Sequence, residues 1–146
     1  MKQWIVAALV LVGAACARKP APGTPGVALT GAPAPRQAVE QFLAAVNAQD
    51  LQAISVVWGT SKGPARDQME RSELERREII MQGCYAHDRF RILEEGPAPG
   101  GERNVRVEIT RGRTTATPTF AVVQGPSNRW YVRDAGISAM TALCRR

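Results

Sequence analysis

The sequence contains a single histidine, His87, and only three cysteines. One histidine cannot build a histidine-rich zinc site, and it cannot supply the several histidines that HD-type phosphohydrolases need. The Gly-x-Ser-x-Gly spacing occurs once, over residues 59–63 (GTSKG), but this segment does not follow a predicted strand, as the nucleophile of a serine hydrolase would, and no Cys-x-x-Cys pair indicates a redox site. We therefore expect no metal site and no cofactor, with His87 on the surface of a strand.

The hydrophobic run over residues 4–15 is short for a membrane-spanning helix, since it covers about a dozen residues against the ~20 that cross a bilayer. Met1 and Lys2 give it a positively charged start, and the small residues 13–15 end it. This order is typical of a secretory signal peptide. We expect cleavage rather than a permanent transmembrane anchor.

Cys16 directly follows these small residues, and this arrangement resembles the lipobox of bacterial lipoproteins. The resemblance implies a signal peptide over residues 1–16 and acyl chains on Cys16, which make membrane lipid its partner. Gly13 departs from the lipobox pattern, in which leucine is commonest three residues before the cysteine. Ala17, in place of aspartate, favours the outer membrane of the cell envelope, facing the periplasm. The alternative is ordinary cleavage of the Ala15-Cys16-Ala17 site, which gives a soluble periplasmic protein.

Residues 17–35 are rich in proline and glycine and lack apolar periodicity. Such a segment cannot bury enough surface to offset the entropy of ordering it, so we predict a tether. Residues 36–146 have the length of a single domain with one core. The expected order is lipid anchor, tether and one folded domain.

Arginine supplies most of the positive charge behind the net charge of +6, but acidic residues are interleaved with the arginines along the sequence. Residues 66–78, for example, alternate arginine with glutamate and aspartate instead of forming a basic run. We expect a solvated, salt-bridged surface and no nucleic-acid partner, because an exported protein does not routinely meet nucleic acid. If the charge has a partner, anionic headgroups or cell-wall polymers fit better.

Apolar residues at helical spacing predict three helices at the start of the domain. Pro35 has the place of a first-turn proline in the first helix, and Asp50 is a good N-cap for the second. The third lies within residues 67–83, with a start as late as Ser72 because Ser72 and Glu75 have capping-box spacing. The expected buried faces are Val39, Phe42, Leu43 and Val46; Leu51, Ile54, Val57 and Trp58; and Leu74, Ile80 and Met81.

Alternating residues and glycine-rich turns predict an antiparallel sheet after the helices. A loop is expected at 59–64, and the strands are expected at 85–93, around 105–109, at 114–124 and at 130–135. Helices followed by such a meander form an α+β domain in which the apolar face of the sheet packs on the helices.

Two segments resemble nuclear transport factor 2-like domains: residues 38–51 (AVEQFLAAVNAQDL) and the closing strand 129–132 (RWYV). The resemblance implies a curved sheet that wraps the long helix into a cone with a pocket at its wide end. Members of this family include isomerases, dehydratases and binding subunits, so the fold alone does not give the function. Their sheets often dimerise, which makes a homodimer a further expectation.

Cys84 and Cys144 are the two cysteines of the domain. In an oxidising compartment an even number of cysteines pairs by default, so we predict a structural disulfide. Two buried free thiols, or a metal or redox site, are the alternatives.

Asp88 and Asp134 are the candidate catalytic residues. Strand alternation places each on the apolar face of its strand. If both faces line a cone, burial raises their pKa values and proximity splits them, as general acid–base chemistry requires. The alternative is that both are solvated near strand ends, with Asp134 capping a short helix over residues 137–143.

These patterns favour an exported, lipid-anchored envelope protein with a binding or scaffolding domain over an enzyme. The alternatives are a small-molecule isomerase or hydrolase using the paired aspartates, and a dimerising interaction module. A catalyst should show polar groups converging on an apolar cavity. A purely structural module should instead have that space filled by Phe42, Phe90, Phe120 and Trp130.

Overall fold

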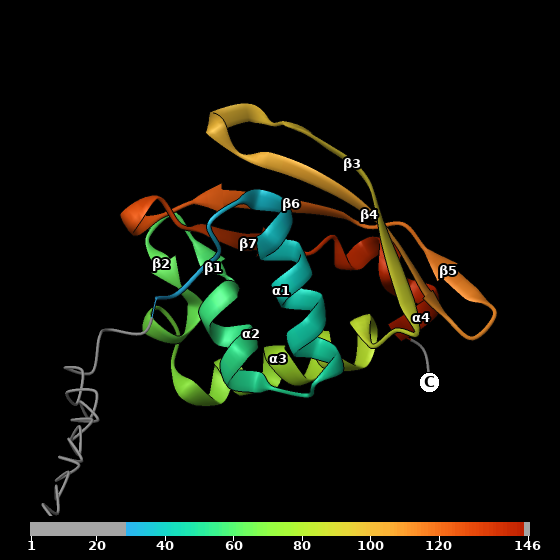
Figure 1. Cartoon of the computed structure of the whole chain (residues 1–146). Coiled ribbons are helices and arrows are strands. Elements are labelled where there is room, and N and C mark those ends of the chain that lie inside the picture. The colour runs from blue at the N-terminus through green and yellow to red at the C-terminus, as the bar shows by residue number, and fades with distance from the viewer. Residues whose placement is uncertain (1–28, 145–146) are drawn as a thin grey trace, which may run out of the picture.

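The computed structural model describes residues 29–144. The predicted signal peptide with Cys16 and most of the predicted tether lie outside the described residues. Helices α1 (Pro35–Asn47), α2 (Leu51–Val57) and α3 (Arg71–Tyr85) lie on one side of an antiparallel sheet, which Figure 1 shows above them. The α+β fold class predicted from the sequence is therefore confirmed.

Helices α1 and α2 start where their local signals predict. Pro35 stands in the first turn of α1, where a missing amide hydrogen costs no helical hydrogen bond. The Asp50 side chain caps α2 by accepting a hydrogen bond from the Ala53 amide at 3.0 Å. The buried face of α1 includes every residue predicted for it: Ala38, Val39, Phe42, Leu43, Ala45 and Val46.

Helix α3 begins at Arg71, within the predicted range, but differs from the prediction in its capping residue, at its C-terminal end and on its buried face. Glu70 caps it by accepting from the Ser72 amide at 2.8 Å, so the predicted Ser72 cap is wrong. Tyr85, expected on a strand, is the last helical residue and is fully buried. Ile80 is 55% exposed instead of buried, because it lies one residue off the buried stripe. That stripe is Leu74, Glu78, Met81, Cys84 and Tyr85.

The sheet has the strand order β3-β4-β6-β7, with β5 paired to β4. The strands are β3 (Arg89–Pro97), β4 (Arg103–Arg111), β5 (Thr114–Ala116), β6 (Thr119–Gln124) and β7 (Trp130–Asp134). The single strand predicted over 114–124 is two strands, because Pro118 has no amide hydrogen for the ladder. The loop predicted at 59–64 is instead a small hairpin of β1 (Gly59–Thr60) and β2 (Gly63–Pro64).

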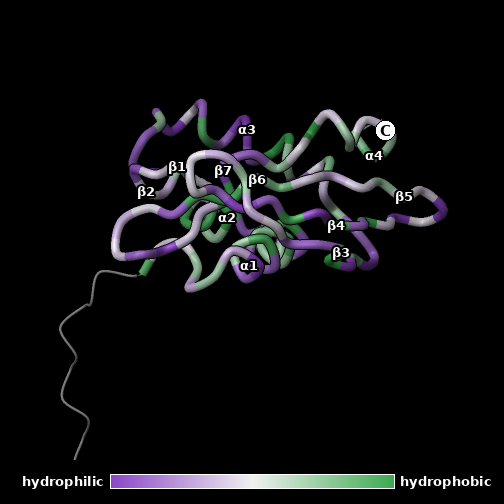
Figure 2. Tube along the Cα trace, turned by 90° about the horizontal axis from the view of Figure 1, so that it is seen from above, coloured by the Kyte–Doolittle hydropathy of each residue, from purple (hydrophilic) through white to green (hydrophobic). Residues whose placement is uncertain are grey.

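Three aromatic rings fill the space between the helices and the sheet. Phe42 of α1 packs edge-on against Tyr85 of α3 and Phe120 of β6, with ring centroids 5.7 and 5.8 Å apart. In Figure 2 the hydrophobic parts of the chain gather where α1 and α2 lie near the sheet. Phe90 is 36% exposed, so it does not fill this interior as expected of a purely structural module.

The folded domain extends further toward the N-terminus than the predicted start at Arg36. Ala32, assigned to the tether, is fully buried and exchanges two backbone hydrogen bonds of 2.8 Å with Trp130. Gly31 has φ +68°, and a Cβ there would lie 2.8 Å from the Tyr131 ring. Glycine is therefore needed at this contact.

The predicted disulfide between Cys84 and Cys144 is confirmed. It joins the end of α3 to α4 (Thr141–Cys144), which follows the 3₁₀ helix η4 (Ile137–Met140). Arg111 supports this junction by donating to the carbonyl groups of Gly83, at 2.9 Å, and Leu143. Within residues 29–144, no helix is both long and apolar enough to cross a membrane.

Candidate functional site

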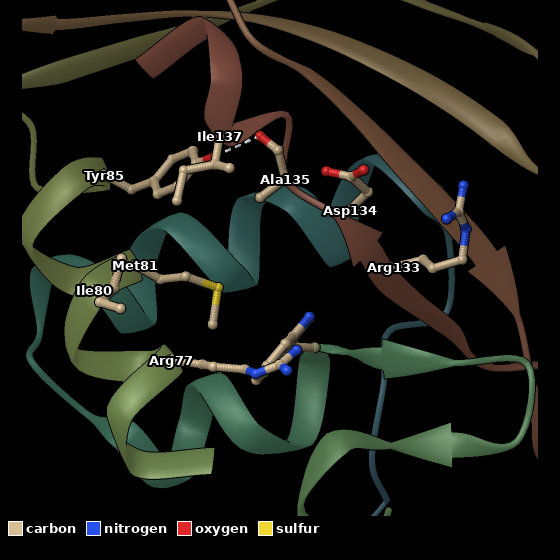
Figure 3. Close-up of a pocket in the computed structure, with 9 residues that line it drawn as sticks. Arg77, Ile80, Met81, Tyr85, Arg133, Asp134, Ala135 and Ile137 are labelled. Carbon is tan, nitrogen blue, oxygen red and sulfur yellow. Dashed lines mark hydrogen bonds between the residues drawn. The ribbon is translucent and has the colours of Figure 1, made fainter. Parts of the chain in front are cut away.

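An apolar cavity of about 370 Å³ opens beside α3 (Figure 3). Its wall includes side chains of α3, the residue after α2, the end of β7 and the start of η4. A smaller cavity of about 230 Å³ also has Trp58, Arg77 and Arg133 in its lining. We call the first cavity the α3 groove, defined by Trp58, Arg77, Ile80, Met81, Tyr85 and Ile137.

The α3 side of the groove follows from helical spacing. Arg77, Met81 and Tyr85 stand four residues apart and share one face of the helix. The Tyr85 hydroxyl donates to the Ala135 carbonyl at 2.6 Å, which fixes the chain after β7 against α3. Burial raises the pKa of Tyr85, and the charge of Asp134 adds to the effect, so the hydroxyl stays protonated.

A bulge shapes the β7 side. Val132 pairs with Val122 and Asp134 pairs with Ala121, which leaves Arg133 as an extra residue on β7. Such an extra residue interrupts the alternation of side chains along a strand. The expectation that Asp134 shares the buried face of Val132 is therefore wrong. Asp134 is exposed and accepts a hydrogen bond from the Gly136 amide at 2.7 Å, in the turn before η4.

Asp88 lies elsewhere, in the loop before β3. Its carboxylate is exposed and accepts a hydrogen bond from the Gly112 amide at 2.6 Å, which ties it to the turn of the β4–β5 hairpin. Asp134 lines the α3 groove and Asp88 does not, so the structure does not bring the two candidate residues into one cavity.

His87 is half-buried in the same loop, not on a strand as predicted. Its Nδ1 lies 2.8 Å from the Tyr85 carbonyl oxygen, and its ring meets the Phe90 ring edge-on at 5.4 Å. These contacts fix the imidazole at the end of α3. Among residues 29–144, no group of three or more histidine, cysteine, aspartate or glutamate side chains is placed to hold a metal ion.

Two arginines border the groove, and they differ in their acidic partners and in the direction of their guanidinium groups. Arg133 donates a hydrogen bond of 2.8 Å to Glu102 through Nη2, and its Nε forms an ion pair with the other carboxylate oxygen at 2.8 Å; this pairing raises the pKa of Arg133. In Figure 3 its guanidinium points away from Met81. Arg77 extends along the groove, where its Nε donates to Glu73 at 2.6 Å. Arg77 is thus the cation nearest the apolar wall.

A larger cavity, of about 480 Å³, lies between the end of α1 and α3 and has a more polar wall. Arg111 lines it, but its guanidinium is bound to main-chain carbonyl groups of the α3–α4 junction. The guanidinium of Arg111 therefore serves the fold, and the α3 groove, whose wall is more apolar, is the better candidate for a ligand.

Comparisons with known proteins found no matching family model, no matching curated protein and no matching solved structure. The chemistry of the groove has to be inferred from its own residues. The groove was not predicted from the sequence, because the sequence pattern predicts Tyr85 on a strand and Ile80 in the core. The repeat of Arg77, Met81 and Tyr85 was the signal that could have located it.

Proposed function

We propose that this chain is an exported, lipid-anchored protein of the cell envelope whose domain binds a small amphipathic anion in the α3 groove. The observation that carries the binding proposal is an apolar cavity with an arginine at its edge. Its volume of about 370 Å³ lies in the range of small-molecule sites, which are apolar with a few placed polar groups.

The export part of the proposal has support from the disulfide. Cys84 and Cys144 are paired, and such bonds persist in oxidising compartments such as the periplasm. The sequence of residues 1–16 supports the same destination, with Cys16 as the acylated residue. Helices packed on one face of an antiparallel sheet support, at a coarser level, the proposed relation to nuclear transport factor 2-like domains.

The apolar part of the ligand is inferred from the rim of the groove. Ile80 and Ile137 border the cavity and are 55% and 47% exposed, while Met81 behind them is buried. A hydrocarbon group in the cavity would remove these side chains from water, and each square ångström of apolar surface removed contributes about 25 cal/mol. The groove therefore favours a ligand with an alkyl or aromatic body.

The anionic part is inferred from Arg77. Its guanidinium carries five N–H donors. Within residues 29–144, Nε is the Arg77 nitrogen that donates a hydrogen bond, to Glu73. A carboxylate bound to the terminal nitrogens would gain charge-assisted hydrogen bonds without displacing Glu73. Arg77 therefore selects a ligand whose head is negative.

Titration calorimetry of the full-length protein with decanoate tests this proposal. We expect decanoate to bind about tenfold more tightly than decylamine, which has the same chain and the opposite charge. Equal affinity for the two, or no binding of decanoate, would overturn the proposal.

Two matched pairs of variants locate the site. Arg77→Gln and Ile80→Asp should each weaken decanoate binding by about tenfold, because they remove the cation and the apolar rim. Arg76→Gln and Ile79→Asp are the controls, since Arg76 also pairs with Glu73, Ile79 is similarly exposed, and neither lines the groove. Equal losses in variants and controls would place the ligand outside the groove.

A further inference from the structure

Glu78 is a buried acid on α3. Its side chain is 1% exposed, and its Oε1 has no hydrogen-bond partner within the described part of the chain. A buried carboxyl oxygen without a donor is unfavourable, and native structures rarely keep one without a reason. The ion pairs on the exposed side of α3 do not involve it, since they join Glu73 and Glu75 to arginines.

A cavity of about 270 Å³ lies against Glu78, between α2, α3 and the 3₁₀ helix η1 (Ala65–Asp67). We call it the Glu78 pocket; it is lined by Gln52, Arg66, Met69, Arg71, Leu74, Glu75 and Glu78. Arg77, Ile80 and Tyr85 of the α3 groove do not line it.

We propose that the Glu78 pocket is a second binding site, for a small zwitterion of the α-amino-acid type, whose ammonium group donates to Glu78 and whose carboxylate lies on Arg66. The inference stands independently of the α3 groove and its ligand.

The charges around the pocket favour this ligand. Arg71 is engaged with Glu75 through a hydrogen bond of 2.8 Å. Nε of Arg66 lies 3.6 Å from Oδ1 of the neighbouring Asp67, which is too far for a hydrogen bond. Arg66 therefore remains the guanidinium of this pocket that can bind a carboxylate, and it lines the same pocket as the unpartnered Glu78.

The remaining walls suit a short apolar side chain. Leu74 is buried and Met69 is half-buried, and both line the pocket. Gln52, from α2, adds an uncharged polar group. A ligand with an ammonium group, a carboxylate and a compact alkyl side chain would thus meet a complementary group at each point.

Protonation of Glu78 makes the binding depend on pH. Burial raises the pKa of Glu78 to about 7, and the nearby charge of Glu75 acts in the same direction. Arg66 and Arg71 are the cations that line the same pocket. An ammonium group needs the carboxylate form, so it competes with the proton near neutral pH.

Three probes of one shape separate the parts of the ligand. We would titrate the full-length protein with L-leucine, with isoamylamine, which lacks the carboxylate, and with 4-methylpentanoate, which lacks the amine. Leucine should bind about tenfold more tightly than either analogue, because each loses one charge-assisted contact. Its affinity should also be about tenfold weaker at about pH 6 than at about pH 8, following the ionised fraction of Glu78.

Variants test the two named contacts. Glu78→Gln should weaken the binding of leucine and of isoamylamine by about tenfold. Arg66→Gln should weaken the binding of leucine and of 4-methylpentanoate but leave the binding of isoamylamine unchanged. Glu94→Gln, an exposed acid of β3, is the control for the change in charge. The proposal is wrong if leucine does not bind, if it binds no better than its analogues, or if Glu78→Gln keeps its affinity. If Glu78→Gln does not fold, the pH dependence of the unmodified protein decides.

Discussion

Replacing Cys84 and Cys144 together by serine will lower the free energy of unfolding by about 4 kcal/mol. The bond closes a loop between residues 60 positions apart, and it therefore removes much of the conformational freedom of the unfolded chain. It also joins the end of α3 to α4, whose Leu143 is buried. Urea unfolding followed by circular dichroism gives the difference.

The reduced unmodified protein is the matched control for this prediction. Cys84 is buried, so serine at this position adds a cost of its own, whereas reduction with dithiothreitol breaks only the bond. The reductant should therefore destabilise the unmodified protein strongly and leave the double variant unchanged. A loss below about 1 kcal/mol on reduction would show that the bond does little to restrain the unfolded chain.

Glu78→Gln will remove a pH dependence of stability that the unmodified protein should show. Burial raises the pKa of Glu78 from 4.5 to about 7 in the folded state, so the folded protein binds the proton more tightly than the unfolded chain. The contribution of Glu78 to the free energy of unfolding is fully present below about pH 4.5. It falls as the pH rises to about 7 and is constant above that pH. At about 1.4 kcal/mol per pKa unit, the loss is about 3 kcal/mol.

The measurement is a series of urea unfolding curves from acid to mildly alkaline pH. The slope of stability against pH between these limits should be shallower in Glu78→Gln than in the unmodified protein, while Glu94→Gln should retain it. Identical slopes in all three proteins would mean that Glu78 titrates as an ordinary solvated acid.

Local signals in the sequence were sufficient for the first two helices. Pro35 and Asp50 mark helix starts by their own chemistry, without reference to distant residues. The apolar spacing in α1 then identifies its buried face. The same reasoning gave the α+β class, because only the order of helices and strands was needed.

Where distant contacts decide the structure, sequence reasoning failed. Tyr85 ends α3 because its ring packs between Phe42 and Phe120 and its hydroxyl reaches Ala135, contacts that alternation along 85–93 does not reveal. The extra residue at Arg133 depends on the register with β6. That register moved Asp134 off the face on which the predicted catalytic pair depended.

The candidate sites were missed for a related reason. The α3 groove combines residues from α2 to η4, and no single segment carries it. Glu78 lies in a helix whose many charged residues predict a solvated surface. Its burial depends on packing against α2 and η1. The expected homodimer stays a prediction, which size-exclusion chromatography of the full-length protein can test.

Intact mass spectrometry of the membrane fraction tests the central claim, export with lipid attachment, most directly. We expect a chain that starts at Cys16, carries acyl groups on this residue and has the mass of an oxidised Cys84–Cys144 pair; an inhibitor of lipoprotein processing should convert it to a longer, acylated precursor. An unmodified chain that starts at Arg18, or one that retains Met1 with free thiols, would contradict the claim.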